Sequence, residues 1–255
     1  MIYPDFLKQS DKVVILSPSG SIEAKWVEGL TNVLTSYGLD VGVSHHALCK
    51  KGRFAGTDEE RITDLQEAIN NEDVKAIFCS RGGYGLARII DKIDFSPLKK
   101  YPKWVVGFSD ITALHNALNG VGVASIHSIM AKHITLGADG LENLINMLFG
   151  KSVQLEATAN EYNKQGVVEG ELIGGNLSVL YGLRGTPFDL DYTGKILFIE
   201  DLSERLYHID RMVQNLRLGG VFGKIKALVV GQFTDIDDED SFCGVAYGVL
   251  AGAVK

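Results

Sequence analysis

One stretch of the chain constrains its fold more than any other, the run from Lys103 to Leu118. An apolar segment rises to Gly107, Ser109 stands at the bend, and apolar residues at helical spacing follow directly. A strand that passes through a tight turn into a helix is the repeating unit of layered α/β folds. The same turn can present a hydroxyl beside the N–H groups of a helix start, which makes Ser109 the first candidate nucleophile.

Strand and helix signals alternate along the first 150 residues. Thr57-Asp-Glu-Glu60 has the capping-box pattern and predicts the start of a helix that runs to about Asn70. Because helices separate the strands, we expect right-handed crossovers and a Rossmann-like, mostly parallel sheet, with ligands beyond the carboxyl ends of its strands. The strands are predicted over residues 13–16, 40–43, 74–79, 104–108 and 121–126, and a further helix over 24–37.

The pattern changes near Gly150. Residues 151–174 run in short polar and apolar alternation and are predicted to be β-like. A helix is expected after Gly174-Gly175-Asn176, followed by strands over 195–199 and 226–231 with a helix over 207–218 between them. The predicted fold class is therefore α/β. It comprises a Rossmann-like N-terminal domain over 1–150, a linker over 151–167, and a smaller β-rich (α+β) C-terminal domain over 168–255.

Composition excludes several function classes. The formal net charge is −7 and no basic stripe is present, which argues against a nucleic-acid partner. The N-terminus lacks the apolar core of a signal peptide and no window approaches the ~18 apolar residues of a membrane span. We therefore expect a cytoplasmic protein with no membrane partner. Cys49, Cys79 and Cys243 lack CxxC spacing, which predicts neither a disulfide framework nor a zinc site.

Local pattern alone leaves two interpretations of Ser109 open. Serine is a favoured N-cap, and a strand-to-helix junction needs a cap. The G-x-S-x-G elbow of serine hydrolases is incomplete here, because Ile111 stands where its second glycine would be.

Ser80-Arg-Gly-Gly-Tyr-Gly85 follows the strand predicted over 74–79. Its glycines would let backbone N–H groups approach an anion or oxyanion without obstruction by a Cβ atom. An ordinary strand-to-helix turn explains the same residues equally well. The motif is not a dinucleotide fingerprint, because Arg88 occupies the place of a third glycine, and no cofactor is predicted.

Glu200 and Asp201 close the strand predicted over 195–199. A carboxylate at this point could orient a histidine, as the third member of a catalytic triad does. Alternatively, the pair could cap the helix that begins near Leu206, a role that suits Asp201 or Ser203 better than Glu200.

None of the six histidines is predicted to act as the base. His115 lies six residues beyond Ser109 on one helix, which is about 9 Å of rise and another face, so it cannot reach the hydroxyl. His208 is expected to be packed or at the surface. The remaining ones, which lack triad-like or ligand-like spacing, are His45, His46, His127 and His133.

The acidic stretch Asp235–Asp240 has the look of a cation-binding loop. It lacks the glycine at the sixth position, and Ala246 replaces the glutamate at the twelfth. A solvated turn is expected, and no metal is predicted.

Taken together, five motifs occur in an order that resembles the LD-carboxypeptidases, the muramoyltetrapeptide carboxypeptidase family of serine peptidases. That family also includes self-immunity hydrolases of microcin C-type peptide nucleotides. The resemblance spans nearly the whole chain, and five ordered motifs are far more specific than any one of them. They occupy residues 80–85, 107–110, 174–177, 198–201 and 209–211.

The resemblance implies a Ser–Glu–His triad at the junction of the two domains. The nucleophile of the family falls on Ser109 and its triad carboxylate on Glu200, with the backbone amides of Gly83 and Asp110 as oxyanion donors. No metal or cofactor is implied. Residues expected to bind substrate are Arg81, Gly82, Tyr84 and Asn176. The implied reaction releases the terminal D-alanine of a murein tetrapeptide in cytoplasmic peptidoglycan recycling, and members are commonly homodimers.

This chain departs from the family in one respect. The catalytic histidine of the family lies in a Gly-His motif downstream of the region matched by residues 233–255, and no such motif is present. We expect that the sequence is truncated and that, ending at Lys255, it lacks its base. Two alternatives stay open: a hydrolase of peptide-nucleotide amides, and a non-catalytic α/β protein that binds a ligand at the glycine loop.

Overall fold

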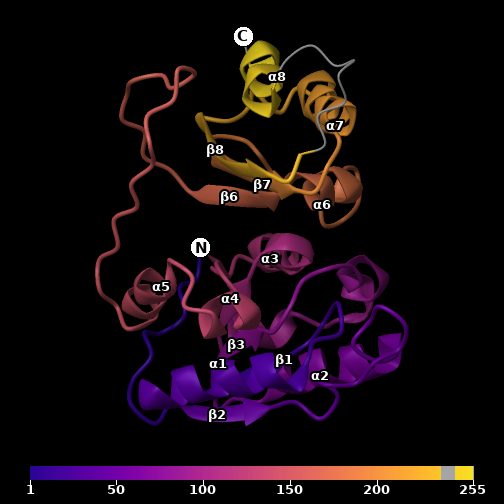
Figure 1. Cartoon of the computed structure of the whole chain (residues 1–255), viewed down its shortest axis with the longest axis vertical. Coiled ribbons are helices and arrows are strands. Elements are labelled where there is room, and N and C mark those ends of the chain that lie inside the picture. Colours follow the sequence, from indigo (N-terminus) through magenta and orange to yellow (C-terminus); the bar gives the residue numbers. More distant parts are fainter. Residues whose placement is uncertain (237–244, 255) are drawn as a thin grey trace. The chain divides into compact units, whose positions relative to one another are not determined.

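The computed structural model describes residues 1–236 and 245–254, and the chain divides into two compact units, residues 1–154 and 155–255 (Figure 1). Each unit has its own hydrophobic core built on its own sheet.

The first unit contains a five-stranded parallel sheet with the strand order β2-β1-β3-β4-β5. Its strands are β1 (Lys12–Leu16), β2 (Asp40–Val43), β3 (Val74–Cys79), β4 (Trp104–Gly107) and β5 (Ile126–His127). Because every strand runs the same way, the loops that follow β1, β3 and β4 emerge at one edge of the sheet. The predicted α/β fold class is confirmed.

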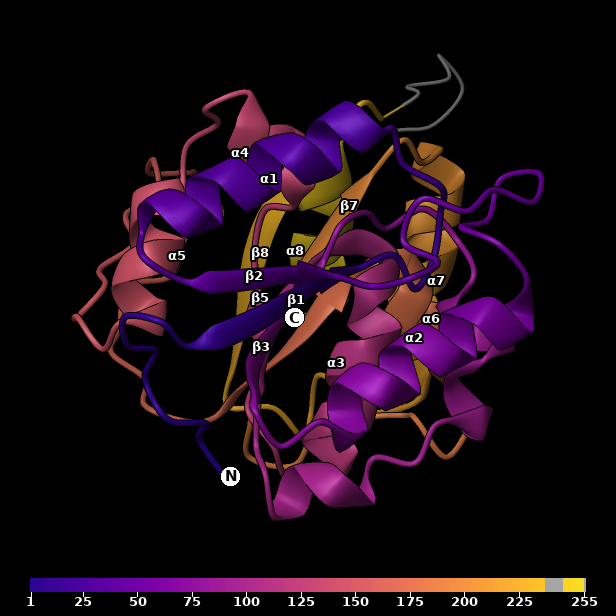
Figure 2. The ribbon, with the colours of Figure 1, turned by 90° about the horizontal axis from the view of Figure 1, so that it is seen from below.

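Helices cover both faces of this sheet (Figure 2). The α-helices α1 (Ala24–Ser36), α4 (Ala131–Thr135) and α5 (Leu141–Leu148) share one core with the strands, while α2 (Asp58–Asn70) and α3 (Thr112–Gly120) lie on the opposite face. Four 3-10 helices complete the unit, namely η1 (Leu86–Arg88), η2 (Ile90–Lys92), η3 (Ser96–Lys99) and η4 (Ser109–Ile111).

The capping box predicted from Thr57 is confirmed. Its Oγ1 accepts a hydrogen bond from the Glu60 N–H at 3.1 Å, and the Glu60 carboxylate accepts one from the Thr57 N–H at 2.7 Å. The strand predicted over 121–126 is wrong for all but its last residue. Residues 121–123 instead close the end of α3, where Val121 and Val123 donate to carbonyls of that helix and Gly122 adopts a φ of +80°.

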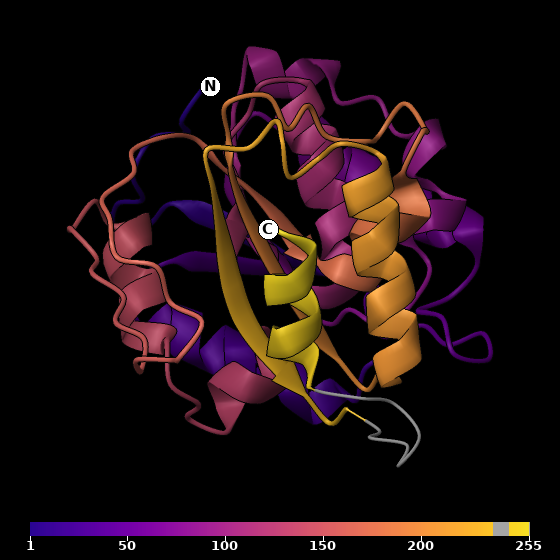
Figure 3. The same cartoon turned by 90° about the horizontal axis from the view of Figure 1, so that it is seen from above.

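The second unit contains a three-stranded parallel sheet, β6-β7-β8, and Figure 3 shows the orange α7 beside the yellow α8 against it. In chain order its elements are β6 (Leu172–Asn176), α6 (Leu177–Leu183), β7 (Ile196–Leu202), α7 (Leu206–Leu218), β8 (Ala227–Thr234) and α8 (Ala246–Ala253). Alternate residues of the central strand, Leu197 and Ile199, are buried against these helices.

The β-like structure predicted over residues 151–174 is wrong for residues 151–171, and β6 begins only at Leu172. No strand occurs between Lys151 and Glu171, and nearly all of these side chains are exposed, Val167 among them. A polar alternation with no apolar surface to cover does not form a sheet. Within the described residues, no helix is long and apolar enough to cross a membrane.

Of the acidic stretch Asp235–Asp240, residues 237–240 lie outside the described part of the chain, as does Cys243. Cys49 and Cys79 are free thiols.

Candidate active site

Ser109 stands where β4 ends, in a strained backbone conformation. Its φ is +63°, in the left-handed region that residues other than glycine seldom adopt. Strain of this kind persists where the surroundings over-determine it and is concentrated at functional sites. The capping interpretation is wrong, because Phe108 is the N-cap of η4 and Ile111 that of α3. The strand-to-helix turn thus has the geometry of a nucleophile elbow.

The glycine loop, residues 80–85, lies directly against this elbow. A Cβ atom built on Gly82 would be 3.0 Å from the Ser109 Oγ and 3.2 Å from the Asp110 backbone nitrogen. Only glycine permits this approach. The structure therefore brings together Ser109, Gly82 and the Asp110 amide, which stands in the first turn of η4, where the helix itself provides no acceptor.

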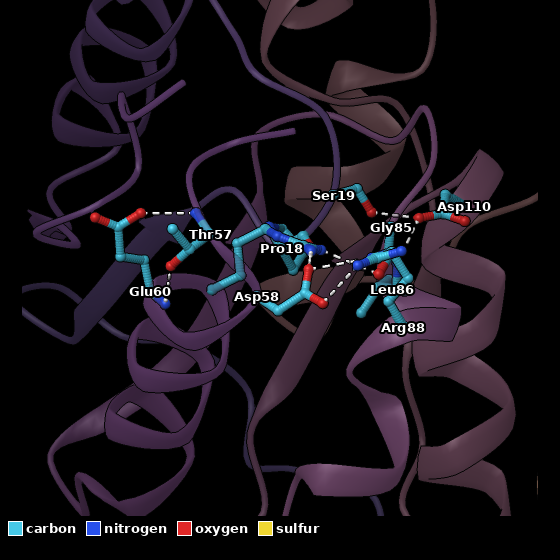
Figure 4. Close-up of polar contacts among 10 residues, drawn as sticks. Pro18, Ser19, Thr57, Asp58, Glu60, Gly85, Leu86, Arg88 and Asp110 are labelled. Atoms are coloured by element: carbon cyan, nitrogen blue, oxygen red, sulfur yellow. Dashed lines mark hydrogen bonds and ion pairs between the residues drawn. The ribbon is translucent and has the colours of Figure 1, made fainter. Parts of the chain in front are cut away.

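The Asp110 side chain has a second role that sequence reasoning missed. Only 4% of the residue is exposed, and its Oδ2 accepts hydrogen bonds from the Ser19 hydroxyl at 2.5 Å and the Leu86 N–H at 3.0 Å (Figure 4). One carboxylate thus joins the loop after β1 to the end of the glycine loop. A single aspartate after a serine gives no local sign of this.

Arg61 is a second buried charge at the same loops, and it too was missed. The residue is 1% exposed, and its Nη1 donates to the Pro18 carbonyl at 2.9 Å and the Gly85 carbonyl at 3.0 Å. Asp58 pairs with its Nη2 at 2.5 Å. The sequence did contain a signal, since Arg61 occupies the apolar stripe of α2 that continues with Leu65, Ala68 and Ile69.

Two of the residues expected to bind substrate point outward from the glycine loop. Tyr84 is 44% exposed, and its ring lies 6.0 Å from that of Phe54, with the guanidinium of Arg53 5.9 Å from the Tyr84 ring centroid. Arg81 is exposed and donates to the Ser21 carbonyl at 2.5 Å. Both side chains are accessible to a ligand that approaches the loop.

His115, which the helix spacing predicts cannot reach the Ser109 hydroxyl, is buried on α3. Its two ring nitrogens lie 2.8 Å from the Ser125 hydroxyl and 2.9 Å from the Gly107 carbonyl. Burial lowers its pKa to about 4, so the ring is neutral near pH 7. It therefore braces the end of β4.

His46 has a partner that its sequence spacing did not reveal. Its Nδ1 lies 2.8 Å from the buried carboxylate of Asp64, which also accepts from the Ser44 hydroxyl at 2.6 Å. This hydrogen bond with Asp64 raises the pKa of His46. The pair fixes the loop that follows β2.

In the second unit, Glu200 lies on β7 opposite Asn176 of β6. Burial and, less strongly, the charge of Asp201 raise the pKa of Glu200 to about 7, against the opposing effect of a hydrogen bond from Asn176. Gly231 makes room for the side chain, since a Cβ there would be 3.1 Å from the Glu200 Cβ. A carboxyl group with this pKa responds strongly to a nearby cation.

Asp201 caps a helix other than the one predicted. Its Oδ2 accepts from the Ser178 N–H at 2.9 Å and its Oδ1 from the Asn176 side chain at 2.8 Å, so it serves the start of α6. The prediction that Asp201 or Ser203 caps the helix near Leu206 is wrong, because Arg205 is the N-cap of α7. Asn176 itself caps α6 by accepting from the Val179 N–H at 3.1 Å.

His208 pairs with Glu204 one turn away on α7, its Nδ1 2.5 Å from the carboxylate. Its side chain is about one third exposed, in agreement with the predicted packed or surface role. Among residues 1–236 and 245–254, no group of three or more potential ligands could hold a metal ion.

Comparison with known proteins places these residues in context. A family model described as the LD-carboxypeptidase N-terminal domain matches residues 13–128, and one described as the LD-carboxypeptidase C-terminal domain matches residues 169–250. The chain is 36% identical over 240 residues to a probable murein peptide carboxypeptidase of Bacillus subtilis. That alignment covers 90% of this chain and 74% of the relative.

Two further similarities are informative. The murein tetrapeptide carboxypeptidase of Pseudomonas aeruginosa is 30% identical, with 88% of this chain and 77% of that protein covered. The crystal structure of a muramoyltetrapeptide carboxypeptidase from Oxalobacter formigenes superposes with a TM-score of 0.83 at 32% identity. It covers 94% of this chain and 83% of that one.

Proposed function

Because the chain belongs to the LD-carboxypeptidase family, we propose that it is a serine peptidase that releases the terminal D-alanine from murein tetrapeptides. The observation that carries the proposal is Ser109, held at a φ of +63° with the backbone of Gly82 against its side chain. The similarity to the murein tetrapeptide carboxypeptidase of Pseudomonas aeruginosa supports the substrate class. We place the reaction in cytoplasmic peptidoglycan recycling and expect a homodimer.

In the proposed mechanism, the Ser109 Oγ attacks the carbonyl carbon of the bond to D-alanine while a histidine accepts the serine proton. The carbonyl oxygen becomes an oxyanion held by the N–H groups of Gly83 and Asp110. The histidine then gives its proton to the departing amine of D-alanine, leaving an acyl-enzyme ester on Ser109. Water, activated by the same histidine, hydrolyses this ester and frees the shortened peptide.

We assign Glu200 the role of orienting that histidine. Its pKa of about 7 makes the isolated carboxyl group partly protonated near neutral pH. An imidazolium beside it would favour the carboxylate and lower this pKa. The carboxylate would therefore be fully charged when the histidine holds the serine proton, the step at which stabilisation matters most.

The test is D-alanine release from a murein tetrapeptide by the full-length protein and its Ser109→Ala variant. We expect loss of turnover in the variant without loss of the fold, because the nucleophile is removed and no buried contact changes. Ser44→Ala is the matched control, since it removes a serine hydroxyl at the end of another strand of the same sheet. Turnover retained by Ser109→Ala would contradict the assignment.

A peptide-nucleotide amide assayed beside the tetrapeptide distinguishes the microcin-type alternative. Covalent labelling of Ser109 by a fluorophosphonate distinguishes an enzyme from a ligand-binding protein, since only an activated serine displaces fluoride from phosphorus.

A further inference from the structure

Two buried charges of opposite sign connect the same pair of loops beside Ser109. The Asp110 carboxylate accepts from Ser19 in the loop after β1 and from Leu86 at the end of the glycine loop. The Arg61 guanidinium donates to the carbonyls of the residues immediately before these two, Pro18 and Gly85. Figure 4 labels Asp110 with its partners Ser19 and Leu86, and the two residues whose carbonyls accept from Arg61, Pro18 and Gly85. We call Ser19, Arg61 and Asp110 the loop clamp.

A third contact fixes the beginning of the glycine loop. The Gly20 N–H donates to the Gly82 carbonyl at 3.0 Å, and a Cβ on Gly20 would lie 2.8 Å from that oxygen. The loop is therefore tied at Gly82, Gly85 and Leu86, and only Gly83 and Tyr84 lie between the ties. Gly83 has a φ of +103°, a conformation that the ties on both sides must hold.

Glycine-rich segments lose more conformational freedom on ordering than any others. Without external contacts, the Gly83 N–H would sample many directions relative to Ser109. Oxyanion stabilisation needs donors that are already oriented when charge develops, and a misplacement of about 1 Å can cost about 10²-fold in rate.

We propose that Arg61 and the Asp110 carboxylate, with Ser19, are positioning residues that hold the oxyanion-binding amides against Ser109. This inference rests on the proposed function. The side chains of the clamp touch no reacting atom, and they act through the backbone of Gly82–Leu86. Asp58 balances the charge of Arg61 within the fold and is itself held by Arg88 at 3.0 Å.

Ser19→Ala tests the clamp with the smallest change, because it removes one hydroxyl and leaves both charges in place. Ser44→Ala is again the matched control. Each variant loses a serine-to-aspartate hydrogen bond of similar length to a carboxylate that is 4% exposed, but only Ser19 is joined to the glycine loop. Similar losses of Tm are expected in the two variants.

The kinetic readout separates positioning from stability. For Ser19→Ala we expect kcat for D-alanine release to fall about 10- to 100-fold with KM nearly unchanged, because the lost interaction matters only in the transition state. The Ser44→Ala variant should keep the wild-type kcat. The rate of Ser109 labelling by a fluorophosphonate, whose phosphoryl oxygen occupies the oxyanion position, should fall in parallel with kcat.

Arg61→Lys provides a second measurement, since it keeps the charge but loses the planar fork whose Nη1 donates to both carbonyls while Nη2 pairs with Asp58. We expect kcat of this variant to fall by a similar factor. When Arg61→Lys is combined with Ser19→Ala, kcat should fall by less than the product of the two single factors, because both residues act on one loop.

The outcomes separate the clamp from the function on which it rests. Equal kcat and labelling rates for wild type, Ser19→Ala and Ser44→Ala would overturn the clamp and leave the peptidase intact. Equal losses in Ser19→Ala and Ser44→Ala would also overturn it, by reducing it to general stability. A wild-type protein that neither releases D-alanine nor reacts with the fluorophosphonate would overturn the clamp together with the peptidase.

Discussion

Lys103 offers a quantitative test of the first unit that does not depend on catalysis. The residue is fully buried just before β4, and its Nζ donates to the carbonyl of Asn71, the C-cap of α2, at 2.8 Å. Burial and, less strongly, repulsion from Lys75 lower its pKa from 10.5 to about 8, against the smaller opposing effects of Glu72 and Asp73. The difference between the unfolded and folded pKa values corresponds to about 3 kcal/mol, at roughly 1.4 kcal/mol per pH unit.

The sign of the pH dependence follows from which state binds the proton more tightly. Between about pH 8 and 10.5 the unfolded chain keeps the Lys103 proton while the folded unit has released it. Stability therefore rises with pH across this window. Below pH 8 both states are protonated, and the cost of burying the ammonium is present in full. A Lys103→Met variant has no such group and should lack this rise.

The assay is urea unfolding of wild type and Lys103→Met from pH 7 to 10.5, followed by tryptophan fluorescence. Both tryptophans, Trp26 and Trp104, lie in the first unit, so the signal reports that unit alone. Taking the difference between the two proteins cancels other titrations, such as that of the Cys79 thiol, whose pKa burial raises.

From pH 7 to 10.5, the free energy of unfolding of wild type minus that of Lys103→Met should increase by up to about 3 kcal/mol. A difference that stays flat from pH 7 to 10.5 would refute the reasoning. So would a wild type that loses stability relative to the variant as the pH rises.

Two other predictions concern the site. Gly82→Ala should lower kcat about 10²-fold or more, because its Cβ would lie within 3.0 Å of the Ser109 side chain and 3.2 Å of the Asp110 nitrogen. The rate of D-alanine release measures this loss. Gly120→Ala is the control, because a Cβ at Gly120 meets nothing within 4 Å. The pKa of Glu200 is raised from 4.5 to about 7, so the folded state binds its proton more tightly and stability from this group falls as pH rises from 4.5 to 7. Glu200→Gln should be less sensitive to pH across that window, as thermal unfolding at pH 4.5 and 7 would reveal, and equal sensitivity in both proteins would contradict the shift.

Local signals predicted much of the fold. The strand over 74–79 and the first residue of α2 agree with the structure, because an apolar β-branched run and a capping box each involve only neighbouring residues. The failures arose where local signals competed. Residues 121–126 contain enough valine and isoleucine for a strand, but Gly120 and Gly122 let the chain complete the end of α3 first.

The candidate site shows the same division. Ser109 and the glycine loop could be found from the sequence because a bend with glycines at the end of a strand is a local pattern. The Ser19–Asp110 contact joins residues 91 positions apart, and the Arg61–Pro18 contact joins residues 43 apart. Neither spacing follows from helix or strand periodicity. Only the position of Arg61 on an apolar stripe indicated that a buried partner was required.

The strain at Ser109 and the freedom of the glycine loop are two aspects of one physical requirement. A positive φ at a serine costs of order 1–3 kcal/mol and persists only if neighbouring contacts hold it. Two residues before Ser109, the Gly107 carbonyl is tied to the Ser128 N–H at 3.0 Å and to the His115 ring at 2.9 Å. At Gly82, Gly83 and Gly85 the opposing glycine loop has no side chains that could hold it, so buried polar groups from α2 and η4 hold the end of the loop instead. In the proposed mechanism, backbone N–H groups hold the oxyanion, and the buried side chains of Arg61 and Asp110 hold the loops behind them.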